Sequence, residues 1–592
     1  MLLQGLRESW DLETFFSGGS QSPEFMKAIA SLETEIKELH HKVDALTGEA
    51  SSMAAIVQEV QVTGARINEY VSFVGCLVAQ DVNDRQALNV RSKLEALNAS
   101  FASISVLLDN KLAHMSDTEW QTLLQQKEME AISFSLTERR TSAAQKLSYE
   151  QEALINDLAV DGYHSWSTLY DTVVGNMGIS VTEDGKEEVL SVGQAANKLT
   201  SADREEREHV FAQYTKAWGE VSDYCAEALN HIAGFRTNVY KHRNWDAVLK
   251  EPLEINRMSD ATLKAMWQAI ESKKGLFVDY LNRKAKLLGL DKLSWHDVEA
   301  PISSTSSKMS YDEAANFIVD HFRSFSPKMA EFSKMAFEKQ WIEAEDRNGK
   351  RPGGFCTEFP LSKETRIFMT FSGSPDNVST LAHELGHAFH TYVMDDMPYF
   401  ATTYAMNVAE TASTFAELVV SDAAVKNAQT KEEKISLLED KVQRSVAFFM
   451  NIHSRFLFET RFYEERKQGV VPVERLNELM EEAQKEAYVN ALDVYHPEFW
   501  ASKLHFYITD VPFYNFPYTF GFLFSASIYA IAQQEGQAFE DKYIALLRDT
   551  ASMTVEELAQ KHLNEDVTKP EFWAKGVDVA LKDVEEFLEL TK

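Results

Sequence analysis

The sequence has few cysteines and few residues that break helices. Its 592 residues include only three cysteines (Cys76, Cys225 and Cys356), 13 prolines and 24 glycines. Three cysteines are too few for a disulfide framework, and an odd number cannot all pair with one another. Such a count is typical of a protein in a reducing compartment. No run approaches the ~20 apolar residues of a membrane-spanning helix, and the start, MLLQGLRESWDLETFF, lacks the apolar core of a signal peptide. We therefore expect a cytoplasmic protein without membrane association.

Basic residues are also scarce. Lys and Arg number 59 against 91 Asp and Glu, which gives a formal net charge of −32. Such a surface repels nucleic acid and anionic membrane, and it keeps a protein in solution. We expect neither nucleic acid nor a membrane as a partner, and the charge itself indicates no more than a solvated surface.

Apolar residues recur every three to four positions through much of the chain, which predicts a mainly α-helical fold. The longest amphipathic segments are residues 23–46, 51–79 and 84–110. Asp184-Gly185, between two short apolar runs, is typical of a β-hairpin. A chain of 592 residues is too long to fold around a single hydrophobic core. We therefore predict two domains, an N-terminal helical domain of residues 1–195 and a second domain of residues 196–592.

Residues 383–387 carry the most specific chemical pattern, His383-Glu384-Leu385-Gly386-His387. Residues four apart on an α-helix lie on one face, so both imidazoles can bind one zinc ion while Glu384 acts as the general base for hydrolysis. Ser374-Pro375-Asp376 is a typical helix start. The alternative is a pair of ordinary surface histidines, but the apolar stripe beside them predicts a mostly buried helix, where histidines need partners.

A catalytic zinc usually has three protein ligands. The metzincin pattern requires glycine at 390 and histidine at 393, where this chain has His390 and Val393. Glu410 and Glu417, two helical turns apart, offer carboxylates instead: one can bind the metal while the other hydrogen-bonds a ligand imidazole. Spacing alone does not decide, because Glu410 also has capping-box spacing from Asn407 and Glu417 suits a helix surface.

Two predicted strands, residues 355–359 and 366–371, precede the zinc-binding helix. An edge strand beside the metal can pair with an extended peptide through main-chain hydrogen bonds, which favours peptide substrates. Phe371, at the end of the second strand, and Tyr404, between the two zinc-binding segments, are candidate substrate-binding residues. The alternative for the two strands is a generic small sheet without a role in binding. The alternative for the segment around Tyr404 is a loop that only connects two helices.

Separated motifs give the chain a family resemblance. TLAHELGHAFH and ETASTFAE occur with RPGGFC (351–356), WDL (10–12), HFY (505–507) and FYNFPY (513–518). From about residue 110 to the C-terminus the sequence resembles the oligoendopeptidase F branch of the thimet-oligopeptidase-like zinc metallopeptidases. The resemblance implies that His383, His387 and Glu410 bind one zinc ion per chain and that Glu384 is the general base. Glu417 is then the acid that we expect to hydrogen-bond a ligand histidine.

The same resemblance places His505, Tyr514 and Tyr518 opposite the metal as catalytic residues, with Tyr507 as the substitute if the match shifts. Among so many phenylalanines a tyrosine is otherwise usually structural. The implied fold is a multi-lobed, zincin-like, mainly α structure with a small β-sheet beside the HExxH helix. Its deep channel admits short unfolded peptides and excludes folded proteins.

The predicted activity is therefore that of a zinc endopeptidase acting on oligopeptides. Two alternatives stay open: a zinc exopeptidase (carboxypeptidase or dipeptidase) on a similar helical fold, and a non-catalytic peptide-binding protein. The oligomeric state is not predicted.

Overall fold

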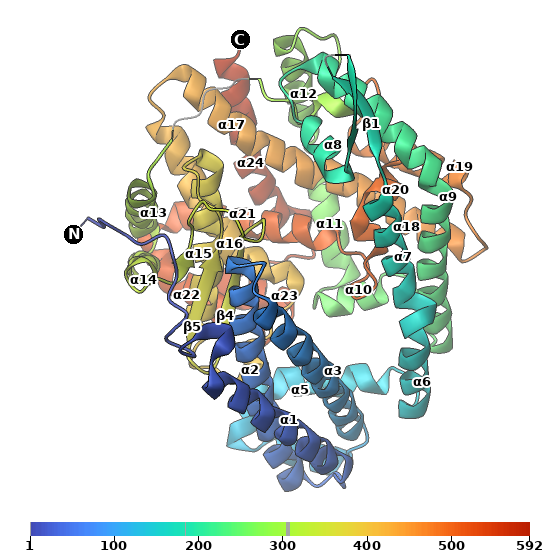
Figure 1. The fold of residues 1–592 in the computed structure, drawn as a ribbon, viewed down its shortest axis with the longest axis vertical. Coiled ribbons are helices and arrows are strands. Elements are labelled where there is room, and N and C mark those ends of the chain that lie inside the picture. Colours follow the sequence, from blue (N-terminus) through green and yellow to red (C-terminus); the bar gives the residue numbers. More distant parts are fainter. Residues whose placement is uncertain (1, 184, 303–307) are drawn as a thin grey trace. The chain divides into compact units, whose positions relative to one another are not determined.

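The computed structural model describes residues 2–183, 185–302 and 308–592, which are mostly helical with two small sheets (Figure 1). The chain divides into two compact units, each assembled from three segments. Unit 1 comprises Met1–Tyr149, Ser306–Ala423 and Ile531–Glu565; unit 2 comprises Glu150–Thr305, Ala424–Ala530 and Asp566–Lys592. The predicted domain division after residue 195 stays a prediction. None of the described helices is long and apolar enough to cross a membrane.

Unit 1 contains the three long helices predicted near the N-terminus: α1 (Pro23–Asp44), α2 (Ala50–Gln80) and α3 (Arg85–Ala113). Ser22 and Asp84 accept hydrogen bonds from the first turns of α1 and α3, as good N-caps do. The buried stripes of the three helices form one hydrophobic core. Unit 1 also contains α4 (Asp117–Leu124), α5 (Ser133–Ala144), α13 (Tyr311–Phe325), α14 (Pro327–Glu338), α15 (Pro375–Val393), most of α16 (Met406–Asn427), α22 (Glu540–Asp549) and α23 (Val555–Leu563).

A three-stranded sheet in unit 1 has the order β3-β5-β4. β4 (Phe355–Phe359) and β5 (Glu364–Phe368) pair antiparallel, and β3 (Ile342–Glu343) pairs parallel with β5. The two predicted strands are therefore neighbours, and β4 is an edge strand of this sheet. β5 ends three residues earlier than predicted, although the Phe371 N–H still donates to Ala344 O at 2.8 Å.

Unit 2 contains the predicted hairpin, in which β1 (Ile179–Glu183) pairs antiparallel with β2 (Lys186–Leu190). Asp184 of the predicted turn lies outside the described residues, as do residues 303–307. The helices of unit 2 include α6 (Tyr149–Ala159), α7 (Ser165–Asn176), α8 (Val192–Lys198), α9 (Arg204–His242), α10 (Lys250–Ile255), α11 (Asp260–Glu271), α12 (Gly275–Leu287), α17 (Lys431–Val446), α18 (Ile452–Arg466), α19 (Val473–Ala487), α20 (Phe499–Ser502), most of α21 (Phe516–Glu535) and α24 (Pro570–Leu590).

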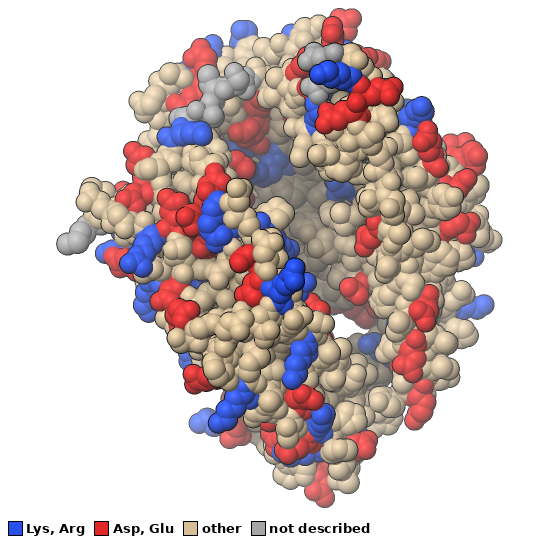
Figure 2. All heavy atoms as spheres, viewed as in Figure 1, with Lys and Arg blue, Asp and Glu red and all other residues tan. Residues whose placement is uncertain are grey.

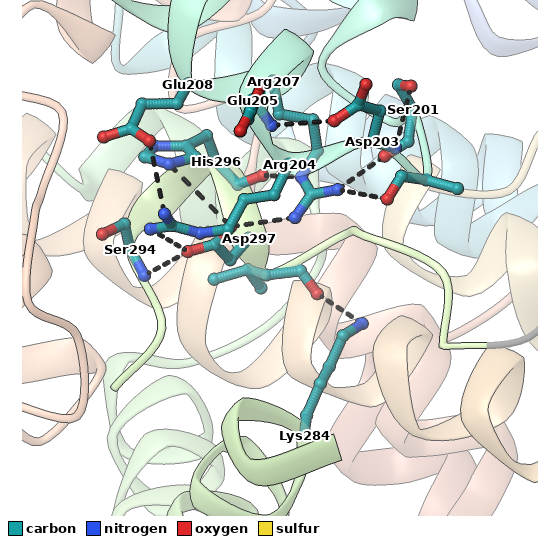
Figure 3. A network of polar contacts seen from close by, with 12 residues as sticks. Ser201, Asp203, Arg204, Glu205, Arg207, Glu208, Lys284, Ser294, His296 and Asp297 are labelled. Atoms are coloured by element: carbon teal, nitrogen blue, oxygen red, sulfur yellow. Dashed lines mark hydrogen bonds and ion pairs between the residues drawn. The ribbon is translucent and has the colours of Figure 1, made fainter. Parts of the chain in front are cut away.

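Charged side chains occur both on the surface and in the interior of this protein. On the face drawn in Figure 2, acidic side chains are spread widely, with Lys and Arg among them. Inside unit 2, a polar network fixes the start of α9 (Figure 3). There the buried Arg207 guanidinium lies 3.0 Å from the buried Asp297 carboxylate, which also accepts from the Ser294 N–H. Because both charges are desolvated, losing either partner is expected to cost ~3–5 kcal/mol of stability.

Candidate metal centre and active site

The HExxH segment lies in α15, which begins where its sequence predicts. The Ser374 hydroxyl accepts a hydrogen bond from the Asn377 N–H at 3.2 Å, and Pro375 occupies the first turn. Leu381 and Leu385 are fully buried. His383 and His387 share the helix face next to this apolar stripe, with ring centroids 4.9 Å apart. The helix therefore presents both imidazoles on the same side.

A carboxylate of α16 meets both imidazoles. Glu410 Oε2 lies 3.3 Å from His383 Nε2 and 3.6 Å from His387 Nε2, and Ser413 donates a 2.7 Å hydrogen bond to the same oxygen. Glu417 Oε2 lies 3.2 Å from the other ring nitrogen of His383, Nδ1. Of the two acids that spacing left open, Glu410 thus faces the Nε2 atoms of both imidazoles, while Glu417 contacts His383 at its other ring nitrogen.

The donor set of His383, His387 and Glu410 suits zinc. One ligand atom from each residue lies within 4.8 Å of the others. Tetrahedral zinc with ligands at 2.0–2.1 Å needs them about 3.3 Å apart. Burial, partly opposed by the Glu410 charge, lowers the pKa of His387 to about 4, so the imidazole is neutral, as a metal ligand must be. Burial by itself would raise the pKa of the Glu410 carboxyl. Its contacts with His383 and His387 have the larger combined effect and lower the pKa to about 2.

Gly386 explains how α16 comes so close to α15. A Cβ atom at this position would lie 2.5 Å from the Ala412 carbonyl oxygen and 2.6 Å from the Ser413 Cα. Both atoms belong to the backbone, so neither can turn away. The glycine inside the pentapeptide therefore lets the two helix backbones touch, which brings Glu410 to the two histidines.

Glu384 is 7% exposed, and burial raises the pKa of its carboxyl to about 7, with the neighbouring Glu410 charge acting in the same direction and His383 opposing it. A general base with a pKa near neutrality suits both uptake and release of a proton. Its Oε1 would lie 3.5 Å from a Cβ at Gly354, just before β4. The predicted base thus lies where the edge strand begins.

The two predicted substrate-binding residues make packing contacts. Phe371 is 6% exposed, and its ring meets Tyr311 edge-on at 5.5 Å. Tyr404 stacks on the buried His390, with centroids 4.3 Å apart and nearly parallel planes, and burial raises the pKa of its hydroxyl. A role in substrate binding stays a prediction for both.

The C-terminal candidates form a cluster of their own in unit 2. Tyr518 donates to the Tyr514 hydroxyl at 3.1 Å, and the His505 ring lies 5.2 Å from the Tyr514 ring. Asn515 Oδ1 lies 3.0 Å from His505 Nδ1 and accepts a 3.0 Å hydrogen bond from Arg455. Tyr507, the substitute candidate, is 1% exposed and stacks on Tyr170 at 3.6 Å, which is a core position.

Comparison with known proteins decides the family. The model of peptidase family M3 matches residues 198–578, and the oligopeptidase F model matches residues 111–178. The chain belongs to peptidase family M3. The resemblance predicted from the motifs is thus confirmed, and the family and its relatives support a metallo-oligopeptidase.

Among curated relatives, this M3 chain is 22% identical to oligopeptidase PepF of Bacillus subtilis, over 98% of the chain and 86% of the relative. It is 26% identical to the chromosomal oligoendopeptidase F of Lactococcus lactis, over 57% of the chain and 56% of the relative. A putative peptidase from Chlamydophila abortus has the same fold, with a TM-score of 0.84, 17% identity and 98% of both chains covered. Oligoendopeptidase F from Enterococcus faecium follows with a TM-score of 0.70, 18% identity and 96% and 98% coverage.

Several contacts of the site were missed by the sequence reasoning. Gly386 and Ser413 had a readable signal, because one lies inside the HExxH motif and the other inside the ETASTFAE motif. Gly354 lies in the RPGGFC segment, which was used for the family resemblance but not for the site. Arg455 had no signal, because it comes from α18, 50 residues before His505.

Proposed function

We propose that this chain is a zinc-dependent endopeptidase that hydrolyses internal bonds of short, unfolded oligopeptides. One zinc ion per chain is held by His383, His387 and Glu410. The observation that carries the proposal is the approach of two imidazole Nε2 atoms to one carboxylate oxygen of Glu410, with a second acid, Glu384, beside them. The names of relatives, oligopeptidase and oligoendopeptidase, support short peptides as substrates. The cysteine content supports a cytoplasmic location.

Glu384 carries the proton through the reaction. Zinc bound by His383, His387 and Glu410 would supply a Lewis acid that lowers the pKa of water and polarises the peptide carbonyl. Glu384 takes the proton from the attacking water and returns it to the amine that leaves, and a pKa near 7 suits both steps. Glu417 holds His383 through its Nδ1 atom, which keeps Nε2 directed at the site.

The edge strand β4 supports a peptide as the substrate. β4 lies at the end of the order β3-β5-β4, and Gly354, directly before it, approaches the Glu384 carboxylate. An extended peptide that adds to this edge uses main-chain hydrogen bonds, which tolerate many side chains. The same pairing brings the substrate backbone to the general base.

His505, Tyr514 and Tyr518 complete the proposal as donors to the tetrahedral oxyanion. The family resemblance supports this role, together with the clustering of the three rings in unit 2. Removal of one such donor costs roughly 2.7–4 kcal/mol of transition-state stabilisation. Arg455 and Asn515 hold the His505 ring in place.

The test uses a peptide of about ten residues blocked at both ends, with products identified by mass spectrometry. An endopeptidase cleaves it internally, whereas a carboxypeptidase or dipeptidase needs a free end. Activity should be lost with a zinc chelator and return when zinc is added back. Glu384→Gln is the matched control, because it preserves the ligand set and removes the base. Cleavage restricted to unblocked peptides would favour the exopeptidase, and a purified protein that binds peptides without bound zinc or turnover would favour the non-catalytic alternative.

A further inference from the structure

The residues of β4 divide between two faces of the sheet. Successive side chains of a strand point to opposite sides, so Cys356 and Glu358 share the face towards which a Cβ at Gly354 would project. Glu384, the proposed general base, lies on that side of the sheet, because a Cβ at Gly354 would lie 3.5 Å from its Oε1 atom. The other face packs into the core of unit 1: the Phe355 ring stacks on Phe368 at 5.2 Å. Glu358 therefore lies on the base's side of the edge strand.

The Glu358 carboxylate has a neutral partner. Asn68 of α2 donates a 2.7 Å hydrogen bond to its Oε1 atom. The side chain is partly buried, and burial raises the pKa of the carboxyl. Among the residues that the structure describes, no Lys, Arg or His nitrogen forms an ion pair with Glu358. A partly desolvated carboxylate of this kind is stabilised by any cation that reaches it.

Two buried carboxylates elsewhere in this chain have a cation beside them. Glu343 lies 3.1 Å from the Lys350 ammonium group, and Glu439 lies 2.9 Å from that of Lys284; in both pairs both side chains are buried. Glu358 differs from these residues in two respects. It lacks such a cation, and it stands on an edge strand that begins at the general base. A ligand can supply the missing positive charge.

We infer that Glu358 selects the substrate by binding a positively charged group of the peptide that lies along β4. The inference rests on the proposed function. From Gly354 to Glu358 is four residues, or about 14 Å of extended chain at ~3.4 Å per residue. An extended peptide has the same rise, so the cation lies three to five residues from the scissile bond. On a peptide antiparallel to β4 this is the N-terminal side. The cation is either a Lys or Arg side chain or the terminal ammonium group of a short peptide.

The experiment measures kcat/KM on peptides that differ in one charge. In the first arm a single lysine moves along a neutral peptide blocked at both ends, and glutamine at the same position is the neutral match. In the second arm the N-terminus of the neutral peptide is either free or acetylated. The variant is Glu358→Gln, which removes the charge and keeps an oxygen to accept from Asn68. The matched control is Glu59→Gln, which changes an exposed acid of α2, the helix of Asn68, that pairs with Lys42.

The wild type should prefer lysine over glutamine about tenfold at one position three to five residues from the cut, the size of one charged hydrogen bond. Glu358→Gln should remove this preference and leave the neutral peptide unaffected, while Glu59→Gln retains it and Glu358→Asp keeps part of it. Preference confined to the second arm assigns the site to the terminal ammonium group.

Two results with the variants overturn the inference: a lysine preference that survives Glu358→Gln, and an equal loss of preference in Glu59→Gln, which would mean attraction by the net charge alone. Absence of any charge preference in the wild type overturns it as well. Cleavage of the neutral peptide separates this failure from a failure of the proposed function. If Glu358→Gln does not fold, that activity disappears, and Glu358→Asp then decides: a reduced or lost lysine preference supports the site, and a preference as strong as that of the wild type refutes it.

Discussion

Gly386→Ala tests the helix contact on which the metal centre depends. The added Cβ would lie 2.5 Å from the Ala412 carbonyl oxygen, whereas ordinary contact begins at 3.4 Å, so the two helix backbones must separate by close to 1 Å. Glu410 Oε2 would leave its positions 3.3 and 3.6 Å from the two imidazoles by a similar amount. A misplacement of about 1 Å costs on the order of 100-fold in activity, and overpacking costs roughly 1–3 kcal/mol of stability.

The assay combines zinc content by mass spectrometry, thermal unfolding of the zinc-free protein, and kcat/KM on a blocked peptide. We expect Gly386→Ala to lose zinc during dialysis that the wild type withstands, and to unfold at a lower temperature. The matched control is Gly75→Ala in α2, where a Cβ meets no atom within 4 Å. Alanine there should stabilise the helix by ~0.5–1 kcal/mol. Wild-type zinc retention and activity in Gly386→Ala would refute the reasoning.

The remaining predictions concern single side chains. Glu384→Gln should keep its zinc and lose turnover, since the ligands stay intact; an active variant would exclude Glu384 as the base. Glu410→Ala should lose zinc far more readily than Glu417→Ala, and metal analysis in the reverse order would exchange their roles. Tyr518→Phe should lower kcat more than it changes substrate affinity if its hydroxyl stabilises the transition state, and equal effects would make it a positioning residue. Burial lowers the pKa of His390 to about 3, below its ordinary 6.5. The unfolded chain therefore binds the extra proton first as pH falls, and the free energy of unfolding should decline from about pH 6.5 towards pH 3. His390→Asn should flatten this dependence in urea titrations, and an unchanged slope would show that His390 is not its source.

Much of the helical fold could be predicted, because periodicity and capping act within a few residues. The three long N-terminal helices, the pairing of Ile179–Glu183 with Lys186–Leu190 and the start of the HExxH helix at Ser374 all depend on such local rules. The end of β5 was misplaced, because its last predicted residues bond to the backbone at Glu343 and Ala344 without extending the paired strand. Such contacts join residues 25 or more positions apart, where periodicity carries no information.

The sequence by itself determined the chemistry. Two histidines one helical turn apart, with a glutamate between them, specify a zinc ligand pair and a base wherever that helix lies. Spacing alone did not distinguish Glu410 from Glu417, because both occupy the same helix face; the tertiary structure adds that Glu410 lies 3.3 Å from His383 Nε2 and Glu417 lies 3.2 Å from His383 Nδ1. The close contact at Gly386 and the uncompensated carboxylate of Glu358 likewise depend on segments distant in sequence. A local sequence pattern determines which ligand and base side chains a helix carries. The packing of distant segments determines which of these side chains come into contact.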